Sequence, residues 1–261
     1  MKLNKPIIII GMGEMSGVFS RALLRSGYPI YPVIRDTPIN ELSKQLSKPE
    51  MVLIAVGEND LDSVLKQLPE QWQDRVVLLQ NELLPHNWKK HKLLSPTIIS
   101  VWFEKKKGQD FKVLVASPIF GPKAEILSSA LKTLSIPTWT VANEEEMLFE
   151  LVRKNLYILT TNIAGLDVGG DVNSLWHNNH ELALRVFDDI LLIQNHLTDQ
   201  QHEREPLIEA VFEAINGDLS HKCMGRSAPD RLERALDYAQ KHQIAVPELK
   251  RISKQIKSSI S

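Results

Sequence analysis

The chain has 261 residues, 43% of them hydrophobic, and a formal net charge of -1. This length suffices for one large domain or two modest ones with real cores. The near-zero charge gives no reason to expect a nucleic acid or an acidic membrane as partner. The single cysteine, Cys223, excludes an internal disulfide, and no apolar run approaches the roughly 20 residues of a membrane-spanning helix. We therefore expect a soluble, cytoplasmic protein.

The first half of the chain alternates short apolar runs with amphipathic helical patterns. Near-continuous apolar runs are typical of strands buried on both faces, and their alternation with helices predicts βαβ units and a doubly wound parallel sheet. Between residues 101 and 121, two strand-like runs flank KKKGQD, which predicts a hairpin that adds antiparallel strands to the sheet. The predicted parallel strands are PIIIIG (6–11), YPIYPVI (28–34), MVLIAV (51–56), RVVLLQ (75–80) and TIISVW (97–102).

From Asn143 onward every pattern is helical. Asn143 is a predicted N-cap, and the three glutamates after it stand in a first turn, where the helix dipole favours acidic side chains. We expect this helix to run for about twenty residues, until Gly165 and then Gly169–Gly170 end it. Four further helices are expected at 178–197, 203–217, 228–242 and 246–257. The sequence thus predicts an α/β domain over residues 1–142 and a smaller all-helical domain over residues 143–261.

Two glycines follow the first predicted strand. A dinucleotide fingerprint needs a first glycine for a tight turn and a second so that backbone N–H groups can approach a pyrophosphate. It also needs a small third residue for helix–strand packing. Strand, turn, helix and second strand follow one another within about thirty residues, as this fingerprint requires. We therefore interpret this turn as a dinucleotide cradle rather than a purely structural turn, formed by Gly11, Met12, Gly13, Glu14, Met15 and Ser16.

The end of the second predicted strand indicates which dinucleotide binds. An NAD site places Asp or Glu there for the ribose 2′-hydroxyl, whereas this strand ends PVIRD, with Arg35 at that position. A guanidinium suits a 2′-phosphate because it pairs bidentately with the dianion. The sequence favours NADP over NAD. Two alternatives stay open: Asp36 in an NAD role, and Arg35 as a solvated charge.

Five features together resemble ketopantoate reductases, members of the 6-phosphogluconate-dehydrogenase-like superfamily. They are the glycine turn, Arg35, the QNELLP turn with Asn81, the long helix holding Lys154, and the closing RALDYAQKHQIAVPE (234–248). The resemblance covers nearly the whole chain. It implies an NADP-dependent reductase that transfers hydride to a small 2-oxo acid or related carbonyl compound, held in a cleft between the domains.

The resemblance also implies roles for individual residues. The family carries a lysine that protonates the carbonyl oxygen as hydride arrives, and two asparagines, spaced four apart, that hold substrate. Lys154 matches the lysine and Asn162 the second asparagine, whereas Ile158 occupies the first asparagine position. Asn81 is expected near both cofactor and substrate. On the residues alone, Lys154 with Thr161 forms a polar stripe on an apolar helix, and a solvent-directed Lys154 is the alternative.

Departures from the family pattern motivate two other functions. Gly57 stands in a turn where the family has a lysine, and Ser227 stands where it has a glutamate. A dinucleotide-binding sensor or scaffold without turnover is one alternative, and an opine- or β-hydroxyacid-type dehydrogenase is the other. Arg226, beside Ser227, is suited to grip a substrate carboxylate; its alternative is an ordinary surface arginine.

Three further features of the sequence say less about function. The motif WHNNH (176–180) offers two histidines without further ligands at a zinc-like spacing, so we expect no metal site and interpret it as a surface loop leading into a helix. Cys223 beside His221 is interpreted as a small residue at a helix turn rather than a reactive thiol. Apolar faces on the second-half helices are compatible with a homodimer.

Overall fold

The computed structural model describes residues 4–260, and the chain divides into two compact units. Unit 1 ends at Leu151 and unit 2 begins at Val152, within helix α6 (Glu144–Val168), whereas the predicted boundary precedes this helix. The predicted class is confirmed: a βαβ-built sheet comes first and an all-helical region follows. No helix within residues 4–260 is both long and apolar enough to cross a bilayer.

Unit 1 is built on a seven-stranded sheet in the order β2-β1-β3-β4-β5-β8-β9. Neighbouring strands are parallel except β5 and β8, which are antiparallel. The apolar runs predicted as strands form the first five. β1, β3 and β4 are buried along their whole length, as expected for central strands with helices on both faces. The predicted burial on both faces is wrong for β2, which is the edge strand of the sheet and exposes Tyr31 and Pro32. The strands are β1 (Ile7–Ile10), β2 (Ile30–Val33), β3 (Met51–Ile54), β4 (Val76–Leu78), β5 (Thr97–Ile99), β8 (Ser117–Phe120) and β9 (Thr138–Thr140).

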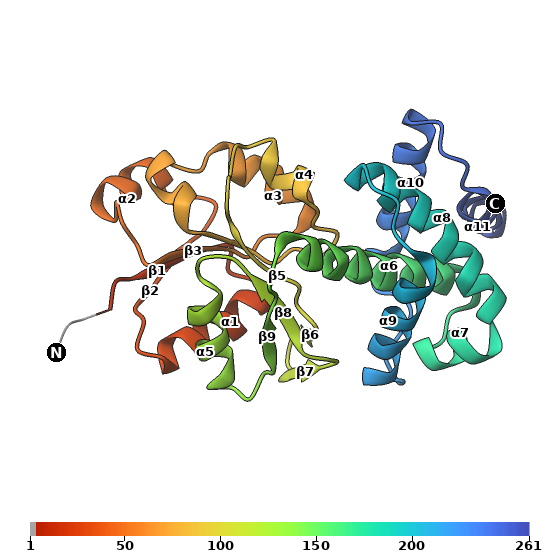
Figure 1. Cartoon of the computed structure of the whole chain (residues 1–261), viewed down its shortest axis with the longest axis horizontal. Helices are drawn as coiled ribbons and strands as arrows, with labels where there is room; N and C mark the ends of the chain where they lie inside the picture. Colours follow the sequence, from red (N-terminus) through yellow and green to blue (C-terminus); the bar gives the residue numbers. More distant parts are fainter. Residues whose placement is uncertain (1–3, 261) are drawn as a thin grey trace. The chain divides into compact units, whose positions relative to one another are not determined.

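Helices cover both faces of this sheet. Figure 1 shows α1 and α5 on one side and α2 and α3 on the other. On the first side, Phe19 of α1 and Leu127 of α5 pack with Ile7, Ile9 and Leu53 in one buried core. The helices of unit 1 are α1 (Glu14–Arg25), α2 (Ile39–Gln45), α3 (Glu58–Lys66), α4 (Pro85–Lys89) and α5 (Ala124–Lys132), with a 3₁₀ helix over Glu70–Arg75.

The predicted hairpin exists, but it does not join the main sheet. β6 (Phe103–Lys105) and β7 (Phe111–Val113) pair antiparallel as a separate two-stranded sheet. Phe103 contacts both Phe19 and Phe111, with ring centroids 5.8 and 6.3 Å apart, so the hairpin is held against α1 by aromatic packing. The antiparallel strand that the main sheet gains is β8, further along the chain.

Over residues 152–260, the regular structure of unit 2 consists of helices and one isolated bridge between Asp171 and Lys222. The predicted cap of α6 is present: the Asn143 side chain accepts from the Glu146 N–H, and the Glu146 carboxylate accepts from the Ala142 N–H, both at 2.9 Å. The remaining helices are α7 (Val172–Asn178), α8 (His180–Thr198), α9 (Arg204–Gly217), α10 (Ala228–Lys241) and α11 (Pro247–Ile260).

Two local predictions in unit 2 are wrong. Gly165 lies inside α6 rather than ending it, and a Cβ built there would come within 2.7 Å of the Cys223 Cβ. The absence of a side chain at Gly165 therefore lets the segment at Cys223 and Met224 pack closely against α6. WHNNH is not a loop: its first three residues end α7, whose N-cap Asp171 accepts from the Ser174 N–H, and His180 begins α8.

Candidate functional site

A groove of about 1230 Å³ opens at the carboxyl ends of three strands of unit 1. The chain runs from β1 to β2 on one side and then crosses to β3 on the other, so the groove lies where the strand order reverses. Ligands of open α/β sheets bind at such a switch point. Its lining includes Gly11, Met12, Gly13, Arg35, Gly57 and Asp60.

The glycine turn has the backbone geometry that a cradle requires. Gly11 adopts φ +90, and a Cβ there would lie 2.8 Å from Val56 Cγ1 and 2.9 Å from the Ala55 carbonyl oxygen, so only glycine fits. Gly13 is the N-cap of α1, and a Cβ on it would meet no atom of the described residues within 4 Å. The open space beside Gly13 and the N–H groups that begin α1 fit a pyrophosphate.

The other residues predicted for the cradle support it rather than line it. Ser16 is fully buried and donates a 2.6 Å hydrogen bond to the Gly13 carbonyl, which fixes the turn. Met15 packs against the core of unit 1, and Glu14 forms a 3.0 Å ion pair with Lys105. Asn81, half-buried in the turn after β4, does not belong to the groove lining that the structure describes.

Each of the two basic side chains lining the groove has a carboxylate beside it. Arg35 is 93% exposed, and its Nη2 lies 3.9 Å from the Oδ2 of Asp60, which also lines the groove. Lys66 Nζ lies 2.6 Å from an oxygen of Asp62, which also contacts Lys90 and His91. These contacts, that with Lys66 first, hold the pKa of Asp62 well below its usual range. The groove is therefore close to electrically balanced.

Two of these lining residues were not assigned to the cofactor site from the sequence. Gly57, noted only as a departure, caps α3, and a Cβ there would meet nothing within 4 Å among residues 4–260. It repeats at β3 the strand–glycine–helix pattern found at β1, which is the signal that identifies it. Asp60 follows in the first turn of α3. No pattern around it announces its contact with Arg35.

The proposed catalytic helix α6 carries its polar side chains in different surroundings. Lys154 is half-buried, and its Nζ lies 6.0 Å from the centroid of the buried Tyr157 ring. Asn155 is buried and donates to Gln194 at 2.9 Å, and the Thr161 hydroxyl donates to the Tyr157 carbonyl at 2.8 Å. Ile158 is buried, at 7% exposure, as an apolar residue should be.

Asn162 holds the segment that precedes α10. Its Nδ2 donates to the Cys223 carbonyl at 3.0 Å, and its Oδ1 accepts from Arg231 at 2.7 Å. Arg226 and Ser227 lie exposed in this segment, with Ser227 as the N-cap of α10. Within unit 2, Asn162 is therefore tied to the chain segment that carries Arg226 and Ser227, two further residues predicted to bind substrate.

Cys223 is a packed thiol. It is fully buried against α6, and burial first, then the Asp171 carboxylate, raises its pKa to about 11. Such a thiol stays protonated at neutral pH and is a poor nucleophile. The interpretation of Cys223 as a small structural residue agrees with this environment.

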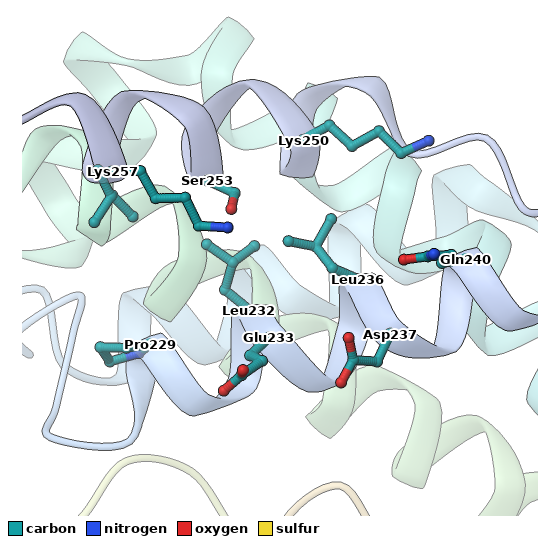
Figure 2. A pocket seen from close by; sticks show the side chains of 10 residues that line it. Pro229, Leu232, Glu233, Leu236, Asp237, Gln240, Lys250, Ser253 and Lys257 are labelled. Atoms are coloured by element: carbon teal, nitrogen blue, oxygen red, sulfur yellow. The ribbon is translucent and has the colours of Figure 1, made fainter.

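A second groove, of about 460 Å³, lies between α10 and α11. Figure 2 shows Leu232 and Leu236 pointing from α10 toward α11, which presents Ser253 and Lys257 from the opposite side. Glu233 and Asp237 line the groove from α10, and Lys250 and Lys257 line it from α11. The groove thus has an apolar floor, acidic side chains on its α10 side and basic side chains on its α11 side.

Comparison with known proteins gives a consistent picture of the fold. No family model matches the sequence, and no curated protein does. Among solved structures, 2-dehydropantoate 2-reductase from Methylococcus capsulatus is 13% identical, with 97% of this chain and 96% of that chain covered at a TM-score of 0.68. D-mandelate dehydrogenase in complex with NADH is 12% identical, with 97% and 98% covered at 0.64.

The dimeric ketopantoate reductase from Staphylococcus aureus is 15% identical, with 97% of this chain and 98% of that chain covered at a TM-score of 0.61. The matches span both units of the chain. The protein is therefore an α/β chain of Rossmann type with a helical C-terminal region. More narrowly, it has the fold of ketopantoate reductases, in a sequence that diverges far from theirs.

Proposed function

We propose that the protein is an NADP-dependent reductase that transfers hydride to a small 2-oxo acid or a related carbonyl compound. The observation that carries this proposal is the groove at the ends of β1, β2 and β3, with Gly11 at the positive φ of a tight turn and Gly13 facing open space. Arg35 at its edge supports NADP as the nucleotide. The structural neighbour that holds NADH supports a pyridine nucleotide.

The proposed chemistry divides between the nucleotide and this chain. Bound NADPH supplies hydride to the carbonyl carbon. As negative charge develops on the carbonyl oxygen, the Lys154 ammonium gives it a proton, so the C=O group becomes CH–OH. Asn81 and Asn162 are proposed to orient cofactor and substrate, and Arg226 with Ser227 to bind the substrate carboxylate.

Two measurements on the intact chain test this proposal. Titration of NADPH fluorescence should show saturable binding, and oxidation of NADPH at 340 nm should accelerate with at least one member of a panel of 2-oxo acids. A Gly13→Val variant, whose side chain enters the open space of the turn, is the matched control and should lose nucleotide binding. If the wild-type chain binds neither NADPH nor NADH, the proposed function is wrong.

A second candidate is a nucleotide-binding protein without turnover. Two observations favour it: Ile158 presents a buried apolar side chain where the family has an asparagine, and both ends of the Asn162 amide are engaged, by Cys223 and by Arg231. Tight NADPH binding combined with no oxidation across the whole panel would support this candidate over the reductase.

We also propose that the chain forms a homodimer through the groove between α10 and α11. An isologous interface must be self-complementary, and this groove has acidic side chains on its α10 side and basic side chains on its α11 side. A two-fold axis along the groove places α10 of each copy over α11 of the other, which brings opposite charges together. The dimeric state of a structural neighbour supports the proposal.

A further inference from the structure

We infer that Asp60 opposes the binding of a nucleotide 2′-phosphate in the groove, and so sets how strongly NADP(H) is preferred over NAD(H). This inference rests on the proposed cofactor function and assigns a specificity role to a residue outside the glycine turn. Two observations carry it: Asp60 lines the same groove as Arg35, and its carboxylate lies 3.9 Å from the Arg35 guanidinium.

The two side chains reach the same place from different βα units. Arg35 follows β2, whereas Asp60 stands in the first turn of α3, where the positive end of the helix dipole stabilises a negative charge. The Asp60 N–H donates to the Gly57 carbonyl at 3.1 Å, which fixes its backbone at the start of the helix. The Asp60 backbone therefore has a defined position, and Arg35 is the more exposed side chain of the pair, at 93% against 58%.

A 2′-phosphate that pairs with Arg35 in its present position approaches this carboxylate. Bidentate contact places phosphate oxygens within about 3 Å of the guanidinium, which itself lies 3.9 Å from the Asp60 carboxylate. The dianion and the carboxylate then repel each other across a short, solvated distance. Because water and salt screen this repulsion, it lowers the affinity for a nucleotide with a 2′-phosphate by only about three- to tenfold.

The rest of the groove offers little compensation. Lys66, the other basic residue of the lining, already has Asp62 within 2.6 Å of its ammonium, and Glu41 adds a further carboxylate to the lining. Adding a phosphate dianion to this balanced groove is therefore unfavourable unless Arg35 turns from Asp60 to the phosphate. NAD(H) carries no such phosphate and avoids the repulsion.

The test compares wild type with Asp60→Asn and a matched control. Glu125→Gln is the control, because Glu125 is an exposed carboxylate in the first turn of α5, on the opposite side of the sheet from α3. Kd values for NADPH and NADH are measured by fluorescence titration at low and high salt. Competition by 2′,5′-ADP and by 5′-ADP isolates the contribution of the 2′-phosphate from that of the nicotinamide half.

In Asp60→Asn, the Kd values for NADPH and 2′,5′-ADP are expected to fall about three- to tenfold at low salt. The Kd values for NADH and 5′-ADP should stay within about twofold of wild type. At high salt, the gain in affinity for NADPH and 2′,5′-ADP should disappear. Glu125→Gln is expected to change neither the ratio of the Kd values for NADPH and NADH nor that for 2′,5′-ADP and 5′-ADP by more than about twofold. An unchanged Kd ratio in Asp60→Asn, or a shift toward NADH, overturns the inference while the cofactor function stands. If wild type binds neither nucleotide, the proposed function and this inference fail together.

Discussion

The ammonium of Lys154 is the side chain on which the proposed turnover depends most. Replacing it with alanine removes the proton donor but leaves the groove of unit 1 untouched. We expect Lys154→Ala to lower kcat for carbonyl reduction at least about a hundredfold while the Kd for NADPH stays within about twofold. Steady-state kinetics and fluorescence titration measure the two quantities. Lys132→Ala, at the exposed end of α5, is the control. Equal turnover in Lys154→Ala would remove this residue from the mechanism.

Alanine substitutions at the two glycines of the turn are expected to have different effects, on stability at Gly11 and on NADPH binding at Gly13. Gly11→Ala forces a side chain into φ +90 and against Val56 and the Ala55 carbonyl, so we expect a loss of about 2–4 kcal/mol in unfolding free energy. Gly13→Ala has an extended backbone and open space, so its stability should fall by less than about 1 kcal/mol. NADPH affinity should nevertheless drop in Gly13→Ala. Urea denaturation and NADPH titration separate the two effects, and equal stability losses would contradict the assignment.

At this scale the sequence identifies residues whose roles are local. Gly11 and Gly13 can be placed because a strand, a turn and a helix follow one another in the chain, and Arg35 because it closely follows the next strand. Asp60 could not be placed, since its contact with Arg35 depends on β1 separating β2 from β3 in the sheet. Asn81 and Lys154 were assigned through family resemblance, and their roles stay predictions.

Among the elements, α6 shows how tertiary packing reverses a helix propensity. Glycine inside a helix costs about 1 kcal/mol relative to alanine, so Gly17→Ala in α1, where a Cβ would touch nothing described within 4 Å, should stabilise the protein by up to that amount. Gly165→Ala instead pushes a Cβ to 2.7 Å from Cys223 Cβ and should destabilise by about 1–3 kcal/mol. Urea denaturation of both variants checks the opposite signs, and stabilisation by Gly165→Ala would contradict the packing argument.

A pH-dependent contact links α3 to the segment after α4. Asp62 contacts Lys66, Lys90 and His91, and these partners lower its pKa in the folded protein below the ordinary 3.8. A carboxyl whose pKa falls on folding stabilises the folded state above its unfolded pKa, and this stabilisation is lost as the pH falls through the folded pKa.

Asp62→Asn is therefore expected to be less stable than wild type at about pH 7. The difference should shrink steadily as the pH falls below 3.8. Urea midpoints measured across this range check the slope. A difference that stays constant at every pH would show that the contacts of the ionised carboxylate do not contribute.

Element prediction failed where an element is short or its signal comes from elsewhere in the fold. β9 has only three residues, with exposed Trp139 at its centre, and it exists because β8 offers an unpaired edge. α7 was not predicted, because several asparagines in and around it favour a loop, although Asp171 caps it as aspartates commonly do. By contrast, β1, β3 and α6 were predicted because long apolar or capped patterns dominate their segments.

At the scale of the whole molecule, the order of strands and helices along the chain is enough to predict the architecture. Alternating strands and helices can cover a parallel sheet only by crossing over its faces, which gives the switch point at which the groove lies. The helices after α6 are not interleaved with strands within the described residues, so they have no sheet to cover; α7, α10 and α11 pack against α8 instead. The order of elements along a chain does not depend on sequence identity. The fold could therefore be predicted although the chain is only 12–15% identical to the two ketopantoate reductases and the D-mandelate dehydrogenase that share it.

The proposed dimer makes a whole-molecule prediction that charge reversal can test. In a two-fold arrangement along the second groove, Glu233 and Asp237 of each copy face Lys250 and Lys257 of the other. Reversing the acidic pair to lysine makes both sides of the groove positive, and reversing the basic pair to glutamate makes both negative. Either variant alone should weaken the dimer at least about tenfold, because like charges then face each other across the interface.

An equimolar mixture of the two variants restores the complementary arrangement, since the all-positive groove of one copy faces the all-negative groove of the other. Sedimentation velocity should therefore find dimers in wild type, monomers in each variant, and heterodimers in the mixture. Dimers that persist in both variants would place the interface elsewhere, and a wild-type monomer at micromolar concentration would contradict the dimer itself. The mixture is the decisive sample, because damage to folding by either double substitution could abolish assembly but could not produce its recovery.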